Sequence, residues 1–405
     1  MIKKIKIEQL KPGVFVHDFN SGWLHHPFLH NQITIKNERE IEKVIKYGTR
    51  EVYIDTAKGI DIDDAPTKQE VDREIETNLR LPTARPSDSN YRVPLRKEIG
   101  RAKALAVEAT QFVHTLMDKA KLGKQINMGE VEWIVERMTT SVLNNKDALV
   151  NLLRIKDKDQ YTYTHCVAVS ALCISFGERL GFQHEQIKAV GIGGLLHDIG
   201  KVKIPNEILN KPGPLTEREF EIMKKHVDHG HCMLQDATRI EQNSVCVTTH
   251  HHERLDGTGY PAGLKGDQIS LFGQLAAIVD IYDALTSERC YKGSMPPTEA
   301  LKKLFEWSPA YLNRDLVEQF IAHLGIYPIG AVVRLESGLI GVVVDHGENG
   351  LLYPTVRAVF DTKANKRIDP FDINLSKSPV GGGSDGIAAC ESAAKYKINF
   401  LAHLS

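Results

Sequence analysis

The alternation of apolar and polar residues at the start of the chain predicts a small α+β module over residues 1–60. Alternation or short apolar runs predict four strands, at residues 2–7, 13–16, 32–36 and 51–54. Between the last two, Ile41, Val44 and Ile45 have the spacing of one helix face, which predicts a helix over residues 38–47. Short strands around a single helix are typical of a compact module.

Residues 61–94 are predicted to be a linker because the composition changes there. The segment is polar and contains Pro82, Pro86 and Pro94, which interrupt regular structure. One exposed helix near residues 67–79 fits the pattern within this linker.

A long helical domain is predicted over residues 95–326. Apolar residues recur there at helical spacing, as in the stripe formed by Val131, Ile134, Val135 and Met138. Strand-like segments then return and predict a small β appendage over residues 327–376, with strands at residues 331–335, 341–345 and 356–360. Residues 377–405 are predicted to be a tail, since they begin rich in Gly and Ser and show little periodicity.

Composition excludes several classes of function. The 405 residues carry a formal net charge of −1, so there is no basic field of the kind that holds a DNA or RNA duplex. No run of about 18 apolar residues is present, so no membrane-spanning helix is expected. The first ten residues alternate Ile with Lys and lack the apolar core of a secretory signal. The six cysteines form no Cys-x-x-Cys pair, which indicates reduced thiols and a cytoplasmic protein.

Candidate chemistry is concentrated between residues 165 and 252, where nine of the 17 histidines fall. The pair His197-Asp198 follows an apolar helix predicted over residues 187–196. Downstream, three consecutive histidines at positions 250–252 lead into a glycine-rich turn that ends at Pro261. Imidazole and carboxylate groups are the ligands of divalent ions that prefer nitrogen and oxygen. Together the two segments predict metal-dependent hydrolysis, although His197-Asp198 alone fits a helix cap equally well.

Three further residues extend this candidate site. Asp280 interrupts an apolar helix predicted over residues 275–281, where a buried carboxylate without a cation is costly. His226 is predicted to lie within a single helix over residues 217–232. His165 is predicted to lie at the start of a helix that continues over residues 167–180.

These motifs resemble the HD-GYP family, the bacterial cyclic dinucleotide phosphodiesterases of the metal-dependent HD superfamily. Residues 197–201, His-Asp-Ile-Gly-Lys, match the HD motif, and residues 251–261 match the signature loop from His-His-Glu to Gly-Tyr-Pro. Residues 279–286 match a later Asp-containing helix of the family. The resemblance covers roughly residues 153–325. It implies a mainly α protein, in which an all-helical HD-type phosphohydrolase domain is flanked by the small N-terminal α+β module and the short C-terminal β appendage.

The resemblance implies seven metal ligands, namely His165, His197, Asp198, His226, His251, His252 and Asp280. Asp198 would bridge two ions, because its carboxylate has two oxygens with lone pairs to spare. In some family members a Glu four residues before the first histidine helps to hold a third ion. Here that position is Tyr161, and a neutral phenol is a poor ligand near pH 7. We therefore expect two divalent metal ions, Mn, Fe or another ion that nitrogen and oxygen ligands hold.

The reaction implied by the resemblance is hydrolysis of cyclic di-GMP to pGpG and, with a second cleavage, GMP. Two ions about 3.5–4 Å apart can share a water and lower its pKa towards ~7, which provides hydroxide at neutral pH. Asp198 and Lys201 are the expected catalytic residues. Lys201 lies one turn beyond His197 and can reach the substrate phosphate that the hydroxide attacks. The expected substrate-binding residues are Lys201, Tyr260, Arg289 and Lys292. The group that protonates the leaving oxygen stays open between Asp283 and a metal-bound water.

Two alternatives to this function stay open. The domain could bind a cyclic dinucleotide as a sensor and signal to a partner, a role that the separate N-terminal module keeps in play. Alternatively, the hydrolase could act on pGpG or on another cyclic dinucleotide. The N-terminal module also leaves open a homodimer or a signalling partner.

Overall fold

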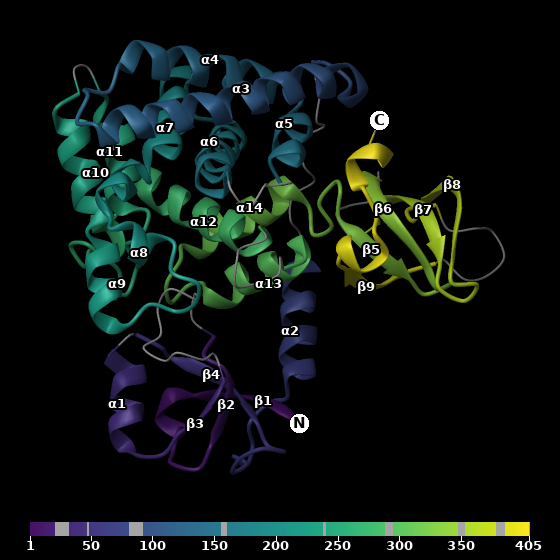
Figure 1. Cartoon of the computed structure of the whole chain (residues 1–405). Helices are drawn as coiled ribbons and strands as arrows, with labels where there is room; N and C mark the ends of the chain where they lie inside the picture. The colour runs from purple at the N-terminus through teal and green to yellow at the C-terminus, as the bar shows by residue number, and fades with distance from the viewer. Residues whose placement is uncertain are drawn as a thin grey trace.

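The structure is a computed structural model, and it describes residues 1–20, 32–46, 48–80, 92–154, 160–237, 240–287, 295–346, 353–377 and 385–404. Within these residues the protein is mainly helical, with one sheet near each end of the chain (Figure 1). The fold class predicted from the sequence is therefore confirmed.

The N-terminal sheet is antiparallel, with the strand order β1-β4-β2-β3. Its elements are β1 (Ile2–Lys6), β2 (Phe15–Asp18), β3 (Ile33–Thr34), α1 (Glu38–Lys46) and β4 (Glu51–Asp55). Alternate strand residues such as Val16 and Ile54 pack against Val44 of α1 in a small separate core. The four strands and the helix predicted for this part of the chain are confirmed, with their ends shifted by a few residues.

Helix α2 (Lys68–Arg80) follows, inside the segment predicted to be a linker. Val71 and Ile75, one helical turn apart, are buried and belong to the same apolar core as α13 (Pro297–Trp307). The helix was therefore predicted correctly, and most of its described residues are exposed as expected, but its buried face was missed. Two apolar residues in a polar segment give too weak a signal to reveal a buried face.

The helical body contains twelve helices within the described residues. They are α3 (Leu95–Lys121), α4 (Met128–Asn144), α5 (Lys146–Leu153), α6 (Tyr161–Arg179), α7 (His184–Leu196), α8 (Asn206–Leu209), α9 (Glu217–Lys224), α10 (His226–Gln235), α11 (Gln242–His250), α12 (Leu271–Thr286), α13 and α14 (Arg314–Leu324). Helix α6 lies at the centre, in contact with α3, α4, α5, α7, α12 and α14. All of its residues from 164 to 177 are buried, which explains why it is apolar on every side.

Two helix boundaries near the candidate site differ from those predicted. The single helix expected over residues 217–232 is two helices, because α9 ends at Lys224 and α10 begins at His226. Helix α6 begins at Tyr161, so His165 lies in its second turn rather than before its start. Apolar periodicity continues across the break at Lys225, and for this reason it did not reveal the break.

The C-terminal sheet is antiparallel, with the strand order β8-β7-β6-β5-β9. Its strands are β5 (Val332–Leu335), β6 (Leu339–Asp345), β7 (Thr355–Asp361), β8 (Lys366–Asn374) and β9 (Ile387–Glu391). The three strands predicted here are confirmed, but β8 and β9 were missed. Strand β8 is a largely exposed edge strand rich in charge, and β9 comes from the predicted tail and pairs with β5.

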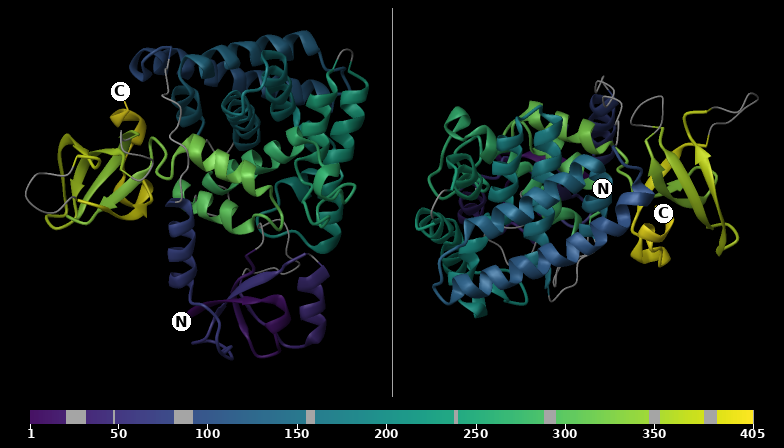
Figure 2. Two further views of the ribbon diagram at one scale, coloured as in Figure 1. Left: turned by 180° about the vertical axis from the view of Figure 1, so that it is seen from behind. Right: turned by 90° about the horizontal axis from the view of Figure 1, so that it is seen from above.

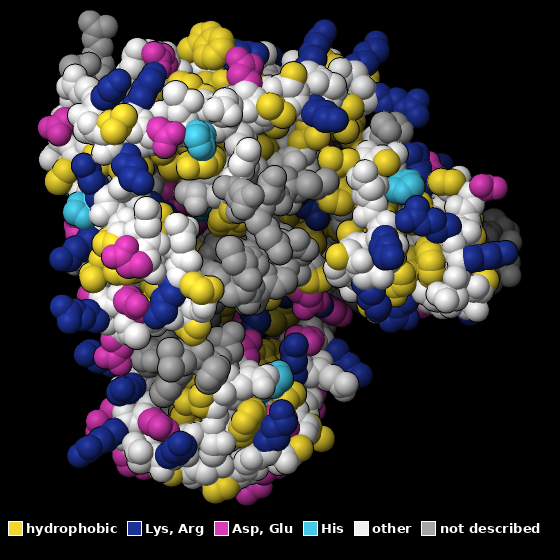
Figure 3. Space-filling model, viewed as in Figure 1, with side chains coloured by type: hydrophobic (Ala, Val, Ile, Leu, Met, Phe, Trp, Pro, Cys, Tyr) yellow, Lys and Arg dark blue, Asp and Glu magenta, His cyan; other side chains and the backbone are white. Residues whose placement is uncertain are grey.

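The two sheets lie against different parts of the helical body. Figures 1 and 2 show the N-terminal sheet at one end of the body and the C-terminal sheet at its side. On the face drawn in Figure 3, basic and acidic side chains are interspersed, in keeping with the net charge of −1. None of the helices in the described part of the chain has the length and hydropathy that a membrane crossing needs.

A substitution at Gly200 tests the close packing of this body. A β-carbon on Gly200 would overlap the backbone oxygen of His226, at the contact between residues 199–203 and α10. We expect Gly200→Ala to lower the free energy of unfolding by about 1–3 kcal/mol, since the added carbon forces the backbones apart. The control Gly100→Ala, at an exposed helix position with open space around it, should raise that free energy by about 0.5–1 kcal/mol. Urea denaturation measures both, and equal stability of the two variants would contradict the packing described.

Candidate metal centre

The seven predicted metal ligands lie together inside the helical body. His165 comes from α6, Asp280 from α12, and the others from the ends of α7, α10 and α11. Six of the seven are at most 8% exposed, and His252 is partly buried. Two groups, His165-His197-Asp280 and His226-His251-His252, each place one ligand atom per residue within 4.8 Å of one another. Folding thus gathers residues that are up to 115 positions apart in the chain.

Asp198 lies between these two groups. Its Oδ2 is 3.2 Å from Nε2 of His197, and its Oδ1 is 3.4 Å from Nε2 of His226. Nε2 of His165 is 3.1 Å from Oδ1 of Asp280. The two carboxylate oxygens of Asp198 therefore face opposite groups of histidines, which is the arrangement that a bridging ligand requires.

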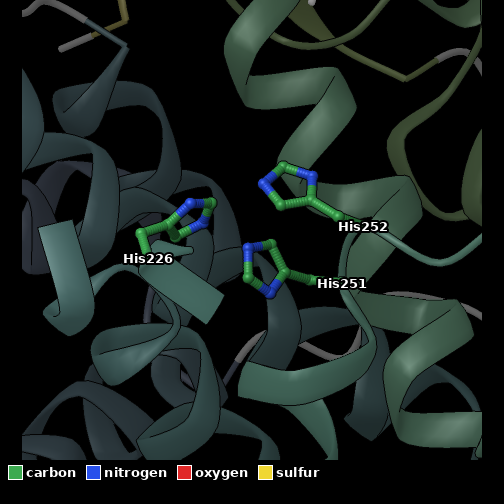
Figure 4. Close-up of side chains that lie close together, drawn as sticks. All are labelled: His226, His251 and His252. Carbon is green, nitrogen blue, oxygen red and sulfur yellow. The ribbon is translucent and has the colours of Figure 1, made fainter. Parts of the chain in front are cut away.

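The second group of histidines is shown in Figure 4, where the rings of His226, His251 and His252 converge from two sides. The ring centroids of His251 and His252 are 4.1 Å apart, and those of His226 and His252 are 5.2 Å apart. Imidazoles gathered this closely bring several lone pairs to one point, which is the feature that binds a cation.

Hydrogen bonds on the far side of each ring fix which nitrogen faces the centre. Nδ1 of His197, His226 and His251 each lies 2.7–2.8 Å from a backbone oxygen three residues earlier. A carbonyl oxygen only accepts, so Nδ1 donates and Nε2 of the neutral ring keeps its lone pair. This pattern of an outer hydrogen bond and a free inner nitrogen is usual for histidines that bind metal.

The inner atoms fit a cation because the protein itself does not satisfy them. Among the buried side-chain atoms of the described residues, Nε2 of His197, His226 and His251 and Oδ1 of Asp198 have no hydrogen-bond partner. Leaving a polar atom buried in this way costs about 1–3 kcal/mol. A divalent ion that prefers nitrogen and oxygen would supply the missing partner for all four.

Burial also sets the charges that such an ion would meet. It lowers the pKa of His226 to about 4 and that of His251 to about 3, so both rings are neutral near pH 7. Burial by itself would raise the pKa of Asp198, but its contact with His197 and the ammonium of Lys201 keep that pKa well below its usual value. Neutral imidazoles around an ionised carboxylate are the protonation states that metal binding needs.

The predicted substrate-binding residues have different outcomes. Nζ of Lys201 lies 2.6 Å from Oδ2 of Asp198, and a quarter of its side chain is exposed. Tyr260 is buried and stacks on His252, with ring centroids 4.6 Å apart. Arg289 and Lys292 lie outside the described residues.

Sequence reasoning missed the support that two residues give to this centre. Oδ2 of Asp283, which the sequence suggested only as a proton donor to the leaving group, accepts a hydrogen bond from Nδ1 of His165 at 2.6 Å. The carboxylate of Glu253 accepts from the backbone of Ala262 and Leu264 and closes the glycine-rich turn. The sequence did contain an indication that Asp283 lies near the site, since it is one turn after Asp280 on the same helix face.

A third residue near the centre was treated only as a reduced thiol. The buried Cys166 brings its sulfur within 4.8 Å of a nitrogen of His197 and an oxygen of Asp198. Its position directly after His165 gave no indication of this, because adjacent helix residues point about 100° apart.

Comparison with known proteins identifies the family. An HD domain matches residues 142–314, and a domain of unknown function matches residues 2–131. The chain is 36% identical over 403 residues to a cyclic di-GMP phosphodiesterase of Pseudomonas aeruginosa, which covers 99% of this chain and 95% of that protein. The chain belongs to the HD-GYP family.

Other relatives match this HD-GYP chain over part of its length. A 3'3'-cGAMP-specific phosphodiesterase of Vibrio cholerae is 43% identical over 145 residues, 36% of this chain and 33% of that protein. A cyclic di-GMP phosphodiesterase of Thermotoga maritima is 38% identical over 165 residues, 40% of this chain and 45% of that protein. Among solved structures, an HD-GYP-type protein of Bdellovibrio bacteriovorus has 18% identity and a TM-score of 0.46, over 79% of this chain and 98% of that one.

The contact between Asp283 and His165 gives a prediction for this HD-GYP centre. Asp283→Ala removes the acceptor that orients the His165 ring, and we expect metal affinity to fall about 10–100-fold. Asp283→Asn keeps an acceptor oxygen, so its metal affinity should fall less than that of Asp283→Ala. Titration of the metal-free protein with Mn²⁺ measures both, with Asp118→Ala on the exposed side of α3 as the control. Unchanged affinity in Asp283→Ala would mean that His165 needs no such support.

Proposed function

We propose that this protein is a metal-dependent phosphodiesterase that hydrolyses cyclic di-GMP to pGpG and, with a second cleavage, GMP. The observation that carries the proposal is the buried cluster in which inner nitrogens and a carboxylate oxygen lack a hydrogen-bond partner. The full-length relative named as a cyclic di-GMP phosphodiesterase supports the choice of substrate.

In this proposal the seven ligands divide into two sets around Asp198. His165, His197 and Asp280 hold one ion, and His226, His251 and His252 hold the other. Asp198 contributes one oxygen to each set, in line with its contacts to His197 and His226. Two bound divalent ions would lower the pKa of a water towards neutrality and offset the charge that develops on the phosphate.

Lys201 is proposed to act on the phosphate from the edge of this cluster. Its ammonium touches Asp198, and its partial exposure leaves one side open to a ligand that arrives from solvent. A cation there would attract the phosphodiester and stabilise the negative charge on its non-bridging oxygens. Arg289 and Lys292 remain proposed phosphate contacts on the basis of the family resemblance.

Tyr260 is proposed to form a wall of the substrate site. Its ring covers one face of His252, so it fixes that ring and shields it from water. Burial raises the pKa of Tyr260 well above its usual value, so the phenol stays neutral. A neutral phenol can donate a hydrogen bond to an anionic substrate, whereas a phenolate would repel it.

In the alternative hydrolase the metal-dependent reaction is the same, but the substrate is a different nucleotide. The 43% identity to a 3'3'-cGAMP-specific enzyme over 145 residues favours another cyclic dinucleotide as the second candidate. A pure sensor is disfavoured, because binding a nucleotide does not require buried ligand atoms that only a cation satisfies.

Turnover of defined nucleotides tests the proposal. Wild-type protein loaded with Mn²⁺ or Fe²⁺ under reducing conditions should convert cyclic di-GMP to pGpG faster than it converts 3'3'-cGAMP, with products followed by chromatography. A faster rate on 3'3'-cGAMP would support the alternative hydrolase, and binding of either nucleotide without turnover would support the sensor.

Two substitutions separate metal binding from phosphate contact. Asp198→Ala should abolish turnover and lower metal content, because the bridging ligand is lost. Lys201→Ala should slow turnover about 100-fold while metal content stays near that of wild type, since only a cation at the phosphate is removed. The exposed Lys203 provides the control Lys203→Ala, which should match wild type. Equal loss of metal in the first two variants would contradict the role of Lys201.

A further inference from the structure

The turn that joins α1 to β4 in the N-terminal module packs directly against the signature loop of the helical body. The motif itself covers residues 251–261, but backbone contacts extend the loop to Gly266, so from here on the signature loop means residues 253–266, without the two predicted ligands His251 and His252. Gly48 has a φ of +77°, and a β-carbon there would lie 2.7 Å from Cβ of Thr258. The backbone of Gly48 therefore packs against the Thr258 side chain and leaves no room for a side chain at position 48. Thr258 lies six residues after His252, the nearest predicted metal ligand along the chain.

Tyr311, between α13 and α14, bonds to the module and to the loop at once. Its hydroxyl donates to the backbone oxygen of Gly48 at 2.7 Å and accepts from the backbone nitrogen of Arg50 at 3.1 Å. Its own backbone oxygen accepts from the nitrogen of Leu255 at 3.1 Å. The guanidinium of Arg254 lies over its ring, 4.9 Å from the centroid. One side chain thus connects the turn of the module to the start of the loop.

A second contact runs through Asp256. Its Oδ2 is 3.4 Å from Nη2 of Arg50, and its Oδ1 accepts from both the backbone nitrogen and the hydroxyl of Thr258. The Arg50 side chain is more than half exposed, so the ion pair by itself contributes little free energy. It does, however, place the module against the residue that shapes the middle of the loop.

The loop carries these contacts to the metal centre as one hydrogen-bonded unit. The carboxylate of Glu253 accepts from the nitrogens of Ala262 and Leu264, and the nitrogen of Tyr260 donates to the backbone oxygen of His252. Tyr260 also stacks on the His252 ring. A displacement of the loop would therefore move Tyr260 and His252 together.

The other end of the interface fixes the module in one orientation. Glu306 of α13 is buried, and its carboxylate is contacted by Lys4 at 2.9 Å, Tyr53 at 2.7 Å, Asn20 at 3.0 Å and Lys303 at 3.3 Å. Buried charges joined in such a network are costly to separate. Figure 1 shows the N-terminal sheet and α1 lying beneath the helical body as this docking requires.

We propose that Tyr311 is a positioning residue through which the N-terminal module holds the signature loop in the conformation that places Tyr260 and His252. The module then controls substrate binding without touching the substrate, because any signal that moves the turn at Gly48 loosens the loop. The kinetic part of this inference rests on the proposed phosphodiesterase function, whereas its structural part does not.

Hydrogen–deuterium exchange of the full chain tests the structural part. Tyr311→Phe keeps the ring and the backbone but removes both hydrogen bonds to the module. We expect amide exchange in residues 253–266 to rise about threefold to tenfold, the range that corresponds to one net hydrogen bond. Gly48→Ala, which pushes against Thr258 from the other side, should raise exchange in the same residues.

The kinetic arm uses cyclic di-GMP and the same Tyr311→Phe protein. KM should rise about threefold to tenfold, again the scale of one hydrogen bond, while kcat and metal content stay near wild type. A wild-type protein that turns over no cyclic di-GMP would contradict the proposed function but leave the exchange result standing, so the two failures are distinguishable.

Tyr53→Phe is the matched control, since it removes a hydrogen bond to Glu306 in the same interface but away from the loop. Its exchange in residues 253–266 and its KM should match wild type. Unchanged loop exchange in Tyr311→Phe would overturn the inference. An equal increase in Tyr53→Phe would overturn it too, because the loop would then respond to docking in general and not to Tyr311.

Discussion

The structure depends on one constraint, which is that a set of candidate ligand atoms is buried without hydrogen-bond partners. Nε2 of His197, His226 and His251 and Oδ1 of Asp198 all face the interior and find no hydrogen bond there. Hydrogen bonds on the outer side of each ring hold them in that direction. An arrangement of this kind is unfavourable by itself and would become favourable with a cation bound, so the proposed metal binding would be coupled to folding.

The helical body meets this constraint by bringing helix ends to one point. Helix α6 runs through the middle of the body and packs against α7 and α12, and α11 packs against α7, α10 and α12. Neighbouring residues then hold the proposed ligands in place, as Asp283 does for His165 and as Tyr260 does for His252. The N-terminal module adds a further layer, since its contact with Tyr311 and Thr258 reaches the loop that follows His252.

The sequence predicted the parts of this architecture that local pattern encodes. Helical spacing and alternation located the helical body, the first sheet and three strands of the second, and the family resemblance supplied the ligand candidates that the fold brings together. Long-range pairing was not predictable in this way. The hydrogen bond between Asp283 and His165 joins residues 118 positions apart. Strand β9 pairs with β5, which lies much earlier in the chain. Val71 of α2 is buried against helices that come much later in the chain. A pattern shows which face of an element is apolar but not what covers it.

The most direct test of the central claim is a crystal structure of the Mn²⁺-loaded protein with anomalous scattering from the metal. The account predicts two anomalous peaks about 3.5–4 Å apart, one on each side of the Asp198 carboxylate. Loaded crystals with no peak among His165, His197, His226, His251 and Asp280 would contradict it.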